Sequence, residues 1–187
     1  MVVVGLAAAA LAVSGASGLH AETSATGVAP RTACPGQLTV AAAPAVQLRA
    51  MRCLVAWTRA HAGLSRLHHN AALDRSAAMR AREIRHCQDF SHTPCGQPFL
   101  SVFTAVGYVT GAATVGENIA WGQGRLGNAR TTMAAWLASP EHRAILLTGS
   151  WRDLGIGRVR AGSFLGRPNV VLWVAQFGRR TAPIPLP

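Results

Sequence analysis

Two apolar segments near the C-terminus constrain the fold of this chain most strongly. Residues 154–159 and 169–177 have the composition of strands, and the Gly/Pro-containing region between them predicts a hairpin. Helical patterns occur earlier in the chain, over residues 46–61, 71–87, 99–106 and 128–138. A sheet face and a helix stripe bury their apolar sides against each other. We therefore expect an α+β fold, an antiparallel sheet with helices on both faces, with a further short strand at 115–121.

The two ends of the chain predict its division into parts. Residues 1–21 resemble a signal peptide, because the uncharged apolar run 2–13 has the length of an h-region and small residues follow it. No positive residue precedes Arg31, which departs from an ordinary signal peptide and leaves a retained weak anchor or a plain first helix as alternatives. Residues 22–42 form an N-terminal arm or linker, 43–180 form one domain, and 181–187 form a C-terminal tail.

The chain is strongly basic, with a formal net charge of +11. An anionic partner such as a membrane surface, a wall polymer or a nucleic acid would explain this charge. Codon bias in a GC-rich genome is the alternative that we favour, because the arginines are spread along the chain. A cluster occurs only on the predicted helix 71–87, where we expect the arginines to face solvent: Arg75, Arg80, Arg82 and Arg85. No nucleic-acid-binding motif is present, so we expect no specific nucleic-acid binding.

Four cysteines are consistent with export, since an even number in an exported chain predicts disulfides. Three pairings are possible, and the most economical joins neighbours in sequence, Cys34 with Cys53 and Cys87 with Cys95. The second ring encloses residues 88–94 and would restrict the movement of His92. No C-x-x-C motif occurs, which makes a zinc knuckle or a thioredoxin-type site a poor interpretation.

Three residues capable of metal or proton chemistry stand in separate strings, namely His92, Glu117 and His142. Two imidazoles and one carboxylate are a common ligand set for a divalent metal with an open position, and they can also act as an acid–base set without metal. Glu117 lies in an otherwise apolar strand and needs a partner if it is buried. His142 follows a predicted helix start at Ser139, where the helix dipole favours a neutral imidazole. Each residue alone also has an ordinary structural explanation, and spacing cannot bring the three together.

The strings around these residues resemble the CAP superfamily, also called SCP domains, and most closely its bacterial secreted branch. The resemblance covers residues 45–178 and is carried by Phe90-Ser91-His92, by 116–122, by Trp136 with 139–143, by 154–157 and by 173–178. It implies an α-β-α sandwich with a large cleft. It also implies that His92, Glu117 and His142 line the cleft, with Ser139 at a fourth position. The two histidines would bind Zn²⁺ or another divalent cation, with Glu117 as a third candidate ligand, and Cys53 would pair with an upstream cysteine.

This chain differs from the family pattern at two places. Ser139 stands where many members have a second glutamate, and Ala56-Trp57 stands where bacterial members commonly have Asn-Arg. Both differences argue against a complete proton-transfer site, and they leave the three-residue metal site intact.

We therefore expect a secreted, extracellular or cell-envelope-associated binding module for a lipid, an anionic membrane surface or a wall polymer. One alternative is a metal-assisted hydrolase of peptide, ester or glycan, with Glu117 as the candidate catalytic residue. The other alternative is a structural His/Glu cluster without metal. The sequence gives no indication of the oligomeric state.

Overall fold

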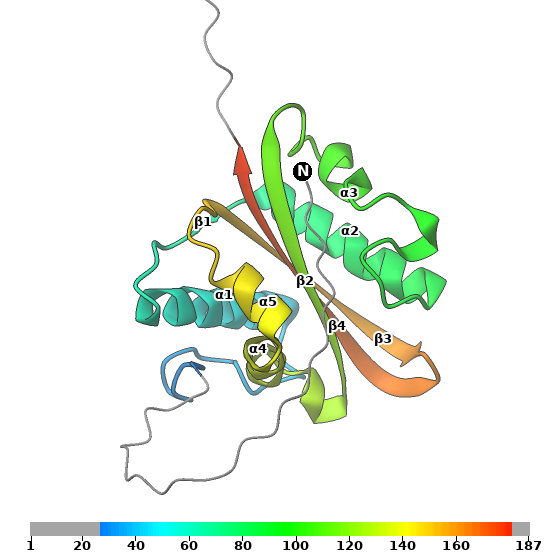
Figure 1. Ribbon diagram of the computed structural model, residues 1–187. Coiled ribbons are helices and arrows are strands. Elements are labelled where there is room, and N and C mark those ends of the chain that lie inside the picture. The colour runs from blue at the N-terminus through cyan, green and yellow to red at the C-terminus, as the bar shows by residue number, and fades with distance from the viewer. Residues whose placement is uncertain (1–26, 181–187) are drawn as a thin grey trace, which may run out of the picture.

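A four-stranded sheet separates two layers of helices in the computed structural model (Figure 1), which describes residues 27–180. The predicted signal peptide and C-terminal tail lie outside the described residues. The elements in chain order are α1 Pro44–His61, β1 His68–His69, α2 Ala71–Cys87, the 3₁₀ turn η1 Pro94–Gly96, α3 Ser101–Ala105, β2 Ala113–Gln123, the 3₁₀ turn η2 Gly124–Gly127, α4 Ala129–Ala138, α5 Pro140–Leu146, β3 Asp153–Phe164 and β4 Arg167–Arg180. The predicted helices and strands are therefore confirmed, and each of the three predicted strands is longer than expected.

The strands lie in the order β1-β3-β4-β2. β3 and β4 form the predicted antiparallel hairpin, and β2 pairs antiparallel with β4 along its whole length. The short edge strand β1 pairs parallel with β3, and both of its histidines are exposed. Two residues are too few to show a strand period, and the pairing depends on backbone bonds such as His68 N–H to Arg152 C=O, 2.8 Å.

Helices α2 and α3 cover one face of the sheet, and α1, α4 and α5 cover the other (Figure 1). The two cores follow the alternation of side chains along β4. Val170, Leu172 and Val174 belong to the cluster beneath α2. Val171, Trp173, Ala175 and Phe177 belong to the larger cluster with α1, α4 and α5. The architecture is the expected α-β-α sandwich.

Two glycines of β3 let α2 approach the sheet closely. A Cβ atom at Gly155 would lie 2.2 Å from the backbone carbon of Leu73, and one at Gly157 would lie 2.3 Å from that of Ala77. No side chain fits there without moving the helix. The Leu-Gly-Ile-Gly string at 154–157 thus serves to seat α2, and α2 in turn carries residues of the site described below.

Both predicted disulfides are confirmed. Cys34–Cys53 joins the N-terminal arm to α1, and Cys87–Cys95 joins the end of α2 to η1. The described part of the arm, residues 27–42, also packs against the α1 layer through Gln37, whose Oε1 accepts from Arg130 at 2.8 Å. Within residues 27–180, none of the helices has the length and apolar character required to cross a bilayer.

Candidate functional site

Glu117 is the buried centre of a polar network on the α2 face of the sheet. It lies on the edge strand β2, and its side chain is 0% exposed. Its Oε1 is 2.8 Å from His92 Nδ1, and its Oε2 accepts a 2.8 Å hydrogen bond from Gln176 Nε2. Arg80 Nε lies 3.5 Å from the same Oε2. The expectation that a strand glutamate here needs a partner is therefore met by three partners rather than one.

Arg80 is a site residue that the sequence interpretation placed wrongly. We expected the arginines of α2 to face solvent, but the Arg80 side chain is 0% exposed. Besides Glu117 it pairs with Glu83 at 3.0 Å and donates from Nη2 to the Phe99 carbonyl at 2.7 Å. The signal was present in the helical period, because position 80 follows Ala77 by three residues and belongs to the inward stripe. Glu117 beneath the helix and Glu83 on the helix itself stabilise the buried cation.

Gln176 extends the network and was also missed. It lies on β4 opposite Glu117, and Ser76 Oγ donates to its Oε1 at 2.5 Å. A glutamine inside the apolar run 170–177 was the available signal, since a buried amide needs hydrogen-bond partners. The nearby Glu83 has its pKa raised by burial, which outweighs the lowering by Arg80, and Glu117 raises it further. The carboxylates therefore repel each other, and Arg80 bridges them.

His92 lies in the segment that the Cys87–Cys95 disulfide closes, as the sequence predicted. Its Nδ1 faces Glu117, its side chain is 47% exposed, and its ring meets Phe99 edge-on with 6.2 Å between centroids. The ring is thus held on its inner side while its outer side remains open to solvent.

His142 belongs to the other helical layer, in the first turn of α5. Its Nδ1 is 2.8 Å from Ser139 Oγ, and its backbone carbonyl accepts from Asn118 Nδ2 at 2.9 Å. Ser139 is the N-cap residue, as expected, but its hydroxyl contacts the imidazole and makes no capping hydrogen bond. Burial, and then the charge of His92, lowers the pKa of His142, against a smaller opposing effect of Glu141. A neutral imidazole therefore results, mainly from burial.

The two histidines approach from opposite layers at the β2 edge of the sheet. Figure 1 shows α5 on one side of β2 and the α2–α3 region on the other. His92 contacts Glu117 and the His142 carbonyl accepts from Asn118, so the two histidines are attached to neighbouring residues of β2. Each Nδ1 is hydrogen-bonded, and neither Nε2 has a recorded partner among residues 27–180. This described region contains no group of three His, Cys, Asp or Glu side chains placed to hold a metal.

Solved bacterial structures have the same fold. An extracellular protein with an SCP domain from Bacillus anthracis gives a TM-score of 0.59 at 18% identity, covering 74% of this chain and 44% of that one. An outer surface protein from Borrelia burgdorferi gives 0.58 at 21% identity, covering 72% and 93%. A cysteine-rich secretory protein from Staphylococcus aureus gives 0.52 at 19% identity, covering 72% and 39%. This chain thus spans less than half of the Bacillus and Staphylococcus proteins.

The comparison with curated proteins gave no match. The scan against protein families matched residues 52–177 to the family described as "CAP: Cysteine-rich secretory protein family". That range includes His92, Glu117, Ser139 and His142, and it exceeds half of the chain. Together with the shared fold, this match shows that the chain belongs to the CAP family of cysteine-rich secretory proteins.

Proposed function

We propose that this chain is a non-catalytic binding module of the cell exterior or envelope, with a divalent-cation site formed by the Nε2 atoms of His92 and His142. The cation would order a site for a lipid or another cell-envelope ligand. The observation that carries this proposal is that both rings are hydrogen-bonded through Nδ1. Both Nδ1 atoms are engaged by Glu117 or Ser139, which leaves both Nε2 atoms for a ligand.

The hydrogen bonds at Nδ1 fit a metal-binding role. An imidazole that donates its Nδ1 proton to a carboxylate or hydroxyl oxygen presents an Nε2 lone pair in a fixed direction. Burial keeps the pKa of His142 low, and a neutral ring is the form that binds a cation. Two protein ligands leave several coordination positions to water or to the bound molecule. Zn²⁺ is one of the divalent ions that such imidazole donors suit.

Glu117 supports binding more than hydrolysis. A general base needs an oxygen directed at the attacking water. Both oxygens of Glu117 are engaged inside the protein, by His92 on one side and by Gln176 and Arg80 on the other. The carboxylate is therefore suited to orienting His92. We assign it that positioning role and do not propose hydrolysis of peptide, ester or glycan.

A structural cluster without metal is the second candidate. The contact of His92 with Glu117 and that of His142 with Ser139 also stabilise the fold by themselves. This role requires no ligand at the Nε2 atoms. It therefore predicts that removing either ring lowers stability but that zinc has no effect on either the wild type or the variants.

The exterior location is supported by chemistry and by the relatives. Disulfides persist in oxidising compartments, and this chain has two. The Bacillus and Borrelia relatives are described as an extracellular and an outer surface protein. A net charge of +11 would draw the module to anionic membrane surfaces or wall polymers.

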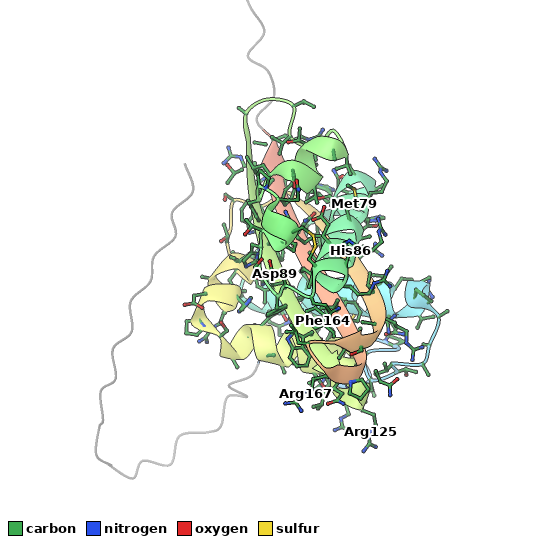
Figure 2. The ribbon with its side chains drawn as sticks, turned by 90° about the vertical axis from the view of Figure 1, so that its right-hand side faces the viewer. Met79, His86, Asp89, Arg125, Phe164 and Arg167 are labelled. Atoms are coloured by element: carbon green, nitrogen blue, oxygen red, sulfur yellow. A yellow bond between two sulfur atoms is a disulfide. The ribbon has the colours of Figure 1, made fainter. Side chains whose placement is uncertain are left out.

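Calorimetric titration of the full chain with zinc tests the cation site. We expect one bound ion in the wild type and at least roughly tenfold weaker binding in both His92→Ala and His142→Ala, because each removes half of the protein ligands. His86→Ala is the matched control, since His86 is exposed on the outer side of α2 (Figure 2). Equal zinc binding by all four proteins would reject the site. Loss of melting temperature in His92→Ala, with no zinc effect in the wild type, would favour the structural cluster.

A further inference from the structure

A recess of about 650 Å³ lies at the β1 edge of the sheet, opposite the edge that carries His92 and His142. It is formed by α1, by the segment after α1, and by β1 with the start of β3. Its wall is basic, with four arginines and two histidines, and no carboxylate is among the lining residues: Arg49, Arg52, Arg59, Arg66, His68 and His69. The apolar part of the wall includes Val55, Leu67 and Leu154.

The positive charge of this basic recess is only partly compensated. Asp74, which lies beside the recess, pairs with both Arg52 and His69, each at 2.5 Å. Arg49 and Arg66 are exposed, and no ion pair is recorded for either among residues 27–180. One carboxylate thus stands against four guanidinium groups, and the electrostatic potential of the recess favours an anion.

The buried Arg59 gives an independent indication of a missing acceptor. Arg59 is 0% exposed and has no carboxylate partner in the described region. Its Nη1 donates to the carbonyls of Leu146 and Thr148, yet its Nη2 is buried without any hydrogen-bond partner. The Nε of Arg52 is likewise buried without a hydrogen-bond partner among residues 27–180. Buried guanidinium donors normally have partners, and these two belong to side chains that also line the recess.

The pKa of Arg59 reflects its burial first and a neighbouring positive charge second. Burial lowers the pKa of Arg59, and the neighbouring charge of Arg152 lowers it further. An anion in the recess would oppose both effects, because it would supply the negative charge that the protein does not place there.

We propose that the basic recess binds an organic phosphate, with the phosphate group against the guanidinium groups and the organic part against Val55, Leu67 and Leu154. A phosphate monoester brings close to two negative charges and three acceptor oxygens, which suits several arginines better than one carboxylate does. The volume of about 650 Å³ matches a small organic ligand and exceeds what a bare phosphate ion fills. The same phosphate chemistry occurs in soluble esters and in lipid headgroups.

Calorimetry with phenyl phosphate, inorganic phosphate and phenol tests this site on the full chain at constant ionic strength. We expect phenyl phosphate to bind most tightly, inorganic phosphate to bind more weakly because the apolar wall stays uncovered, and phenol not to bind. Arg49→Gln combined with Arg66→Gln removes two exposed cations without disturbing the buried ones. This double variant should weaken phenyl phosphate binding by about tenfold or more.

The control makes the same change in net charge elsewhere. Arg125→Gln combined with Arg160→Gln removes two exposed arginines outside the recess, and Arg125 lies at the lower end of the molecule in Figure 2. No binding by the wild type, or equal weakening in both double variants, would overturn the proposal.

Vesicles of phosphatidylcholine with and without phosphatidylglycerol distinguish the source of the phosphate. Displacement of phosphatidylglycerol vesicles by phenyl phosphate would identify a lipid headgroup. Binding of phenyl phosphate without any vesicle binding would identify a soluble ester. Either result, together with the loss in the Arg49/Arg66 variant, supports the site.

Discussion

The two edges of the sheet carry similar ion clusters in different environments. At the β2 edge, Glu117 is held by Arg80 and His92, and at the β1 edge Asp74 is held by Arg52 and His69. The histidines are comparably exposed, 47% for His92 and 55% for His69. The other members differ, since Glu117 and Arg80 are 0% exposed while Asp74 and Arg52 are each 24% exposed.

This difference assigns different roles to the two carboxylates. A buried carboxylate depends on its protein partners, because water cannot replace them. Glu117 therefore acts as a fixed support for His92. Asp74 remains close to solvent. It pairs with Arg52 and His69, so the other arginines of the basic recess have no carboxylate in the described region to balance their charge. The same set of residue types thus positions a histidine at one edge and leaves an anion-attracting surface at the other.

Replacing Arg80 at one edge and Arg52 at the other should give the largest difference in stability between the edges. We expect Arg80→Met to lower the free energy of unfolding by about 3–5 kcal/mol, because Glu117 and Glu83 lose their common buried cation. Arg52→Met should cost about 1 kcal/mol or less, since solvent and His69 still stabilise Asp74. Denaturant unfolding measures both values.

A third variant separates loss of charge pairing from loss of packing at position 80. Glu117→Gln added to Arg80→Met removes the unpaired buried charge, so the double variant should be more stable than the sum of the single losses implies. Arg82→Met, at an exposed position of the same helix, is the control and should change stability by less than about 0.5 kcal/mol. Similar losses for Arg80→Met and Arg52→Met would contradict the comparison.

The position of α2 connects the two edges, because Asp74 lies near one end of the helix and Arg80 nearer the other. Gly157→Ala would place a Cβ atom 2.3 Å from the backbone of Ala77 between them. We expect a loss of about 3 kcal/mol, since the helix must move away from β3. Gly162→Ala is the matched control in the same strand, where a Cβ meets nothing within 4 Å. Unchanged stability in Gly157→Ala would show that α2 can shift without cost.

Local patterns in the sequence predicted most of the secondary structure. The bounds of α2, Ala71–Cys87, agree with the prediction, because an amphipathic stripe and polar flanks specify a helix locally. The terminal hairpin and the two disulfides were also predicted, since both join segments that are near in sequence. The Leu-Gly-Ile-Gly string was recognised as part of a strand, although its role in seating α2 depends on a helix 80 residues away.

The polar interactions inside the fold were predicted less well. Arg80 was assigned to the solvent because an arginine on a helix is usually exposed, and the buried Glu117 that reverses this preference comes from another strand. Gln176 and the pairing of β1 with β3 likewise depend on contacts between distant segments. A common location for His92 and His142 was expected only from the family resemblance, because no sequence spacing brings together residues from two layers.

The last expected effect concerns Asp74 and depends on pH. Burial alone would raise the pKa of Asp74, but hydrogen bonds from Arg52, His69 and the Ile156 amide outweigh it and hold the pKa below 3.8. The carboxylate therefore stabilises the native state above pH 3.8, and this contribution is lost as the pH falls through the lower native value. We expect Asp74→Asn to cost about 1–3 kcal/mol at pH 7. The difference from the wild type should shrink steadily below pH 3.8, in contrast to the pH-independent loss in Gly157→Ala. A constant difference down to acid unfolding would show that Asp74 acts through packing and that its charge is not what balances the β1 edge.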